Sequence, residues 1–320
     1  MFSICALATT AFIYYKSSDY TAILSIIPLW LWSIIFGIPA LIAWLLFRNK
    51  TGLIVFGIWI IFGFSTADFI PPLARTGMQS YRMTPSPGIK HWRVMSLDCS
   101  NLESLPVSRI AEANTDIIFL QGCSNPNEII SFAHQVFGPT AQLRQMGNCA
   151  IIAATGKMGA AWGMPGTNGL IVDWIPQRST LPIRLVNVSL MPANNSSGNV
   201  FSLSTWKYYA SLRVRHRAEL VSVLNSLKAM GTKYGELPVI LAGNFNSSPT
   251  SPIFRVLKDT FVDAFTEKGT GLGVTTPSNY PIKRHCRVLS TAPLAPVSAT
   301  TVEISGANHR AIIADMTKGS

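Results

Sequence analysis

Two clusters of basic side chains could bind an anion. The first lies at the start of a segment with helical periodicity and comprises Arg213, Arg215, His216 and Arg217. The second comprises Lys283, Arg284, His285 and Arg287. Cations are electrostatically unfavourable at a helix N-terminus, so the first cluster favours an anionic partner: a phosphate ester, a lipid headgroup or a nucleic acid. A solvated basic surface without a ligand explains either cluster taken alone, whereas both together favour anion binding.

The cysteines and the other histidines show no pattern of metal ligands. There is no CxxC pair and no zinc spacing among Cys5, Cys99, Cys123, Cys149 and Cys286. His91 and His134 also lack partners at ligand spacing. We therefore expect no bound cofactor and interpret the thiols as small buried side chains.

The apolar residues are unevenly distributed along the 320 residues. The chain is 48% hydrophobic and 13% charged, which excludes a disordered protein because enough apolar surface is available for burial. Residues 78–320 carry 22 of the 26 basic and 13 of the 15 acidic side chains, and thus +9 of the net charge of +11. The sequence divides into an apolar N-terminal part and a basic C-terminal domain.

Residues 1–76 are predicted to form a membrane anchor. No charged residue occurs in 20–47 or in 51–67, and a helix needs about 20 apolar residues to cross a bilayer. Pro71 and Pro72 end the second run, because proline cannot continue a helix. We expect a transmembrane helical hairpin with spans at about 21–47 and 51–70, while residues 1–15 form a further apolar segment that is short for a span. A buried hairpin of a soluble protein is the alternative.

The basic residues beside these runs bear on orientation. Arg48 and Lys50 favour a cytoplasmic turn and hence an extracytoplasmic domain, whereas Arg75 and Arg82 favour the reverse. We expect a membrane protein with an extracytoplasmic domain.

Proline and glycine at 85, 87 and 88 predict a linker over 77–90, and residues 91–320 then form the domain. Its apolar runs predict strands at 92–97, 115–120, 148–154, 181–190, 237–242, 288–289 and 311–316. Helical periodicity marks 108–113 and 213–230. Strands that come in pairs between helices predict an α/β or α+β sandwich.

Five short motifs follow one another in this domain. They are Asp116-Ile-Ile-Phe-Leu-Gln121, Leu185-Val-Asn-Val-Ser-Leu190, Val239-Ile-Leu-Ala-Gly-Asn-Phe-Asn246, Asp263-Ala-Phe265 with 271–276, and Ala307-Asn-His-Arg310. In this order they resemble the endonuclease/exonuclease/phosphatase superfamily, whose members cleave phosphoric esters with a divalent metal. The resemblance implies an α/β four-layer sandwich of two β-sheets flanked by helices. Membrane-anchored bacterial members carry a similar hydrophobic hairpin.

The resemblance also implies a degenerate site. Among the family's catalytic positions, only Asn246 and His309 keep the family's residue. The three replacements are Ser189 for a histidine that stabilises phosphoryl oxygens, Asn244 for the aspartate that orients the attacking water, and Asn308 for the aspartate that polarises the catalytic histidine.

The family's metal ligands are replaced as well. Gly122 stands where the family has its metal-binding glutamate, after a retained Gln121. Cys286 replaces a further aspartate if Arg284 matches the family's arginine, and Asp98, in place of an asparagine, is the one candidate metal ligand.

Magnesium is usually held by one or two carboxylates, and an amide cannot accept a proton from water. We therefore expect a pseudoenzyme that binds an anionic ligand or a partner protein. The alternative is an active phosphodiesterase or phosphatase that uses Mg²⁺ or Mn²⁺ through drifted ligands.

Overall fold

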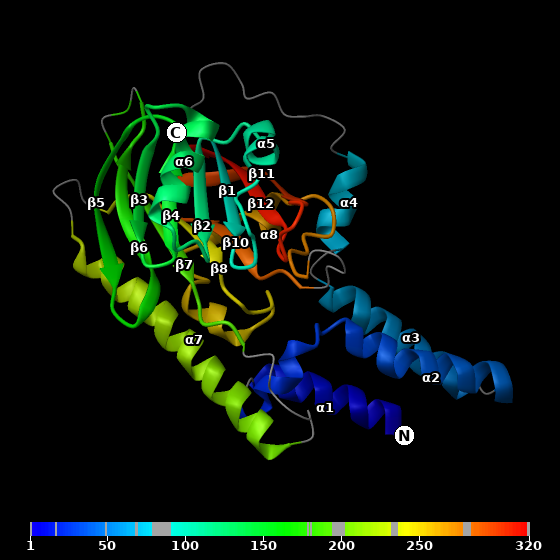
Figure 1. Cartoon of the computed structure of the whole chain (residues 1–320). Helices are drawn as coiled ribbons and strands as arrows, with labels where there is room; N and C mark the ends of the chain where they lie inside the picture. Colours follow the sequence, from blue (N-terminus) through cyan, green and yellow to red (C-terminus); the bar gives the residue numbers. More distant parts are fainter. Residues whose placement is uncertain are drawn as a thin grey trace.

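The computed structural model describes residues 2–16, 18–48, 50–67, 70–78, 91–177, 179, 181–193, 202–231, 236–277 and 283–318. From residue 91 onward, two mixed six-stranded sheets pack face to face, and helices lie on their outer faces (Figure 1). The α/β sandwich predicted from the sequence is confirmed.

The first sheet has the strand order β11-β12-β1-β2-β4-β3. Strands β1 and β2 are parallel, and the other neighbours are antiparallel. The strands are β1 (His91–Asp98), β2 (Ile117–Gln121), β3 (Gln142–Met146), β4 (Cys149–Ala153), β11 (Leu294–Val302) and β12 (Ala311–Lys318).

The second sheet has the order β5-β6-β7-β8-β10-β9, and β7 and β8 are its parallel pair. Its strands are β5 (Lys157–Met164), β6 (Thr167–Ile175), β7 (Ile183–Ser189), β8 (Val239–Asn244), β9 (Val262–Asp263) and β10 (Cys286–Ser290). The domain's helices are α5 (Val107–Glu112), α6 (Pro126–Phe137), α7 (Leu203–Ala229), α8 (Ala264–Lys268) and the 3-10 helix η2 (Pro252–Val256).

The central strands are apolar on both faces because both faces are covered. In β2, Ile117 and Phe119 enter the core between the sheets, whereas Ile118 and Leu120 pack under α5 and α6. The outer face of the second sheet is covered by α7 and η2. The carboxyl ends of the two parallel pairs, β1 with β2 and β7 with β8, are therefore held in place by the buried side chains around them.

The sequence pattern missed β3, β5, β6, β9, β11 and α6. In β5, two glycines and a register shift against β6 interrupt the alternation that marks a strand. The pattern also placed the start of α7 at Arg213, but the helix begins at Leu203.

The N-terminal part consists of α1 (Phe2–Lys16), the 3-10 helix η1 (Asp19–Ile26), α2 (Leu31–Phe47), α3 (Lys50–Thr66) and α4 (Ile70–Met78). The prediction of one continuous span over 21–47 is wrong. Ile27 is extended before Pro28, since proline disfavours a helical conformation in the residue before it, and α2 begins only at Leu31. Helices α2 and α3 lie side by side (Figure 1).

No described helix is both long and apolar enough to cross a bilayer by itself. Among the described helices, one pair reaches that length and composition together: α3 and the Ile70–Thr76 part of α4, whose axes are bent by 73°. Of the predicted linker, residues 77 and 78 belong to α4, and 79–90 lie outside the described residues.

Candidate functional site

The candidate site lies where the two parallel strand pairs end. The register pairs Asp98 with Gln121 in the first sheet and Ser189 with Asn244 in the second. Cys286 begins β10 directly opposite Asn244. The strands therefore bring positions that are far apart in the sequence to one edge of the sandwich.

A hydrogen bond between Asp98 and Asn244 joins the two sheets at this edge. The Asn244 side-chain amide donates from Nδ2 to Asp98 Oδ2, and the backbone N–H of Asn246 donates to Asn244 Oδ1 at 3.0 Å. These two bonds fix which end of the amide faces Asp98. The other Asp98 oxygen accepts from the Ser100 backbone at 2.9 Å, so both oxygens of this buried carboxylate are satisfied by protein donors.

Gly122 follows β2 in a conformation that excludes a side chain. Its φ is +76°, and an ideal Cβ would lie 2.5 Å from the Ser100 backbone nitrogen and 2.6 Å from its Cα. Residues that carry a side chain rarely adopt such a φ, and real Cβ atoms do not approach backbone atoms so closely. The family's glutamate therefore cannot be accommodated here unless the 98–100 turn moves.

Gln121 belongs to a buried network that the sequence reasoning missed. Its Nε2 donates to Asn187 Oδ1 at 2.8 Å, and Asn187 donates to the carbonyl oxygens of Leu120 and Ala150, each at 2.8 Å. Ser96 completes the network. Asn187 thus connects the sheets from the inside, and the signal was a polar residue between two valines of a buried strand.

His309 lies near the start of β10, with its Nδ1 3.9 Å from Cys286 Sγ. Burial lowers the pKa of His309, and the Asp98 charge offsets this only in part, so the imidazole is neutral near pH 7. Burial raises the pKa of the Cys286 thiol far above its usual value. The Asn308 side chain is exposed, and within the described part of the chain no hydrogen bond joins it to His309.

The sequence-predicted site residues are thus largely brought together. Asp98, Asn244, Asn246 and Cys286 lie around one edge with His309, and the half-buried Ser189 lies beside Asn244. Asn246 has a φ of +47°, and its amide donates to the Leu190 carbonyl at 2.7 Å.

This donor set does not fit a divalent metal ion. Asp98 is the single carboxylate, the neighbouring Asn244 presents its N–H₂ end, and Gly122 contributes no side chain. No group of three or more His, Cys, Asp or Glu side chains suited to a metal occurs within the described ranges. Hard cations require several oxygen ligands, which these residues do not supply.

Arg284 and Arg287 do not form an open anion-binding surface, and that prediction is corrected. Both side chains are 4% exposed and pair with Asp263, at 2.7 Å and 3.2 Å respectively. Arg287 also lies over the Phe254 ring at 3.7 Å. Burial alone would raise the pKa of Asp263, but the two arginines outweigh it and lower that pKa.

The arginines of α7 have partners in the chain as well. Arg217 binds Asp19 with its closest atoms 2.6 Å apart, and Arg213 donates to the Ser18 carbonyl at 2.8 Å. Arg215 lies 3.7 Å from Glu219. Since α7 begins at Leu203, this cluster lies within the helix, and the argument from an unfavourable helix N-terminus does not apply.

Comparison with known proteins gives a structural likeness only. No model of a protein family matches the sequence, and no curated protein gives a significant match. An endonuclease/exonuclease/phosphatase family protein from Bacteroides thetaiotaomicron matches with a TM-score of 0.54 at 12% identity, over 72% of this chain and 99% of that one.

Two further matches are TDP2 structures. TDP2 from C. elegans gives a TM-score of 0.53 at 16% identity, over 72% of this chain and 76% of that one. D. rerio TDP2 complexed with a single strand DNA product gives 0.51 at 15% identity, over 71% of this chain and 99% of that one. The domain therefore has the sandwich fold of endonuclease/exonuclease/phosphatase proteins.

Replacing Gly122 by alanine is expected to lower the free energy of unfolding by about 2–4 kcal/mol, because left-handed backbone strain and overpacking add. Gly166→Ala is the matched control, since its φ is +68° and nothing lies within 4 Å of an ideal Cβ. That control is expected to lose only about 1–2 kcal/mol. Denaturant unfolding followed by tryptophan fluorescence measures both, and equal losses would contradict the steric account.

Asn244→Asp is expected to destabilise the protein more as the pH rises. The introduced carboxylate faces Asp98, so the pair has a raised pKa in the folded state and holds one proton that the unfolded chain has released. The free energy of unfolding of Asn244→Asp should therefore fall further below that of the wild type between about pH 5 and pH 8. The difference grows by up to about 1.4 kcal/mol for each pH unit in which that proton is retained.

Asn244→Ala serves as the control for this pH dependence, because it removes the hydrogen bond without adding a charge. Its deficit should be the same at both ends of the pH range. A pH-independent deficit for Asn244→Asp would show that the two side chains are not in contact.

Proposed function

We propose that this protein is a membrane-anchored pseudoenzyme of the endonuclease/exonuclease/phosphatase fold that binds an anionic ligand without hydrolysing it. One observation carries the proposal: Asn244 and Ser100 satisfy the carboxylate that would otherwise bind a metal. The steric exclusion at Gly122 supports it independently.

The acid–base chemistry of the site supports the same conclusion. A general base must accept a proton from water, and the amides of Asn244 and Asn308 cannot. The neutral His309 can accept one, but its neighbour along the chain is an exposed asparagine, and its Nδ1 lies 3.9 Å from the Cys286 thiol. Among the described residues, the charge of Asp98 is the one contribution that favours the imidazolium, and burial outweighs it.

The full chain in neutral detergent is expected to show no turnover of aryl phosphate monoesters or diesters with Mg²⁺, with Mn²⁺ or without metal. Losing a metal and an acid–base pair removes many orders of magnitude in rate. His309→Ala is the control, and it should match the wild type. Metal-dependent turnover that this substitution abolishes would establish the alternative, an active phosphodiesterase or phosphatase.

The membrane anchor is supported by exposed apolar side chains on α2 and α3. Soluble proteins rarely expose large contiguous apolar patches. Here the exposed side chains are Ile34, Ile35, Ile38, Ile42, Leu45, Leu46, Phe47, Leu53, Ile54, Ile58, Ile60, Ile61 and Phe64. With Arg48 and Lys50 at the turn, we propose that the two helices enter the bilayer together and that the domain lies outside the cytoplasm.

The chain is expected to stay in the membrane pellet during alkaline carbonate extraction. Ile54→Lys with Ile61→Lys should release it, since each lysine costs about 2.5–3.5 kcal/mol at the bilayer centre. The control replaces two exposed valines of the domain, Val214 and Val262, by lysine and should stay in the pellet. Release of the wild type would contradict the anchor, and resistance of the domain to protease added outside intact cells would contradict its orientation.

A further inference from the structure

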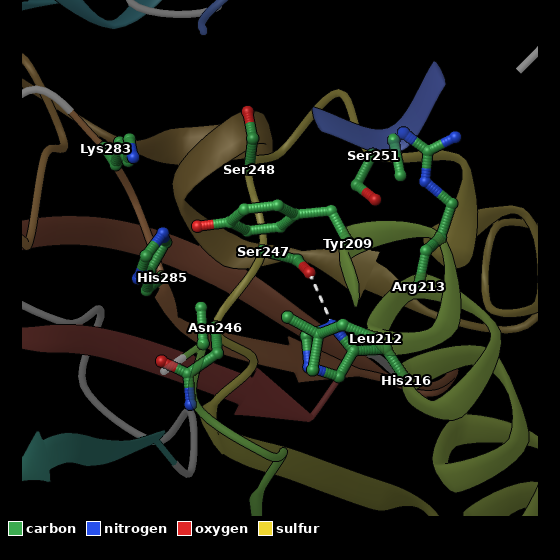
Figure 2. Close-up of a pocket in the computed structure, with 12 residues that line it drawn as sticks. Tyr209, Leu212, Arg213, His216, Asn246, Ser247, Ser248, Ser251, Lys283 and His285 are labelled. Carbon is green, nitrogen blue, oxygen red and sulfur yellow. Dashed lines mark hydrogen bonds between the residues drawn. The ribbon is translucent and has the colours of Figure 1, made fainter. Parts of the chain in front are cut away.

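A pocket of about 170 Å³ lies between the domain and the N-terminal segment. Its walls come from η1 through Ala22, from α7, from the 246–251 loop after β8, and from Lys283 and His285 before β10. Figure 2 shows the Tyr209 ring crossing the pocket from α7, with its hydroxyl on the side of Lys283 and His285. Arg213 lies on the other side, beside Ser251.

The pocket wall contains cations and hydroxyls but no carboxylate among its lining residues. Lys283 is the important cation. None of the carboxylates in the described part of the chain lies within ion-pair distance of it, although the arginines on either side of the pocket are paired with carboxylates or backbone carbonyls. A half-buried charge without a counter-ion is unfavourable, and burial accordingly lowers the pKa of Lys283.

The surroundings of Lys283 favour an anion further. Its backbone is hydrogen-bonded to Thr275 and Thr276, with the Lys283 N–H 3.1 Å from the Thr276 carbonyl oxygen, so the side chain starts from a fixed position. Burial lowers the pKa of the neighbouring His285 to about 3, and the charges of Lys283 and Arg287 lower it too. His285 is thus a neutral imidazole with one N–H to donate, inside a region of positive potential.

We propose that this pocket binds the phosphate group of a phosphate ester, held by Lys283 with hydrogen bonds from Tyr209 and His285. The pocket is smaller than the roughly 300–1,000 Å³ of sites for larger organic ligands, so it suits a compact oxyanion rather than a whole nucleotide. The inference deepens the proposed function, because it assigns the anionic ligand a chemical class and a location.

The position of the pocket suggests two sources of this phosphate. One wall of the pocket contains Ala22, which lies on the segment that leads into α2, and the Asp19–Arg217 ion pair joins this segment to α7. A lipid phosphate could therefore reach the pocket from the bilayer. A free phosphate ester could enter from solvent. Phosphatidic acid and a free phosphate monoester offer the same terminal phosphate group to Lys283, and binding measurements can separate them.

The test titrates the full chain in neutral detergent, without added metal, with inorganic phosphate, glycerol 3-phosphate and short-chain phosphatidic acid. Thermal shift and calorimetry are the readouts, and chloride at equal ionic strength is the reference. We expect saturable stabilisation by phosphate. Lys283→Met should weaken phosphate binding about tenfold or more, and Tyr209→Phe severalfold, because hydrogen bonds to charged groups are strong.

Lys157→Met, at an exposed lysine of β5, is the matched control and should bind phosphate as the wild type does. Lys283→Met should fold with no loss of ligand-free stability, since it removes an uncompensated charge. Tighter binding of phosphatidic acid than of glycerol 3-phosphate would identify a lipid as the source, and equal binding would identify a free ester.

The proposal is overturned if phosphate gives no saturable effect on the wild type, or if Lys283→Met binds phosphate as well as Lys157→Met. It is also overturned if only an oligonucleotide binds in a manner that depends on Lys283. Turnover in the hydrolysis assay would refute the pseudoenzyme while leaving phosphate binding in place, so the two failures are distinguishable.

Discussion

The hydrogen bond from Asn244 to Asp98 is the interaction on which the site depends. It crosses between the two sheets at the end of β1 and β8, where two facing carboxylates would repel each other unless a cation or a proton lay between them. An amide removes that requirement, because it donates to one oxygen of Asp98 and accepts from the Asn246 backbone. Both oxygens of Asp98 thus have donors from the protein itself, and the close approach of Gly122 to Ser100 leaves no room for a further side chain beside them.

The same principle of internal pairing extends to the basic residues. The domain has a net charge of +7, and two of its arginines pair with a single buried carboxylate, Asp263. Its long helix is joined to the N-terminal segment through Arg213 and Arg217. Lys283 differs from these arginines, because it lines a pocket whose described lining residues include no carboxylate. Of the second basic cluster predicted from the sequence, the structure thus leaves Lys283 at the pocket, whereas Arg284 and Arg287 are paired with Asp263.

Much of the fold could be predicted because the central strands carry uninterrupted apolar runs. Strands such as β5 and β11 could not, since glycines, prolines and register shifts interrupt their alternation. The order of the motifs in the sequence located the substituted site positions, but it did not reveal which residues they contact. Asp263 lies 21 residues before Arg284, and Asn187 reaches Gln121 across 66 residues, so only the folded register reveals these partners. The break at Pro28 shows why an uncharged run need not be one helix.

Titration of the full chain with Mn²⁺, followed by electron paramagnetic resonance, tests the central claim most directly. If Asn244 has replaced the metal as the partner of Asp98, the spectrum of free aqueous Mn²⁺ should persist at every ratio of metal to protein. A saturable population of bound Mn²⁺ that disappears in Asp98→Asn would contradict the account. It would mean that the edge of the sandwich rearranges to hold a metal after all.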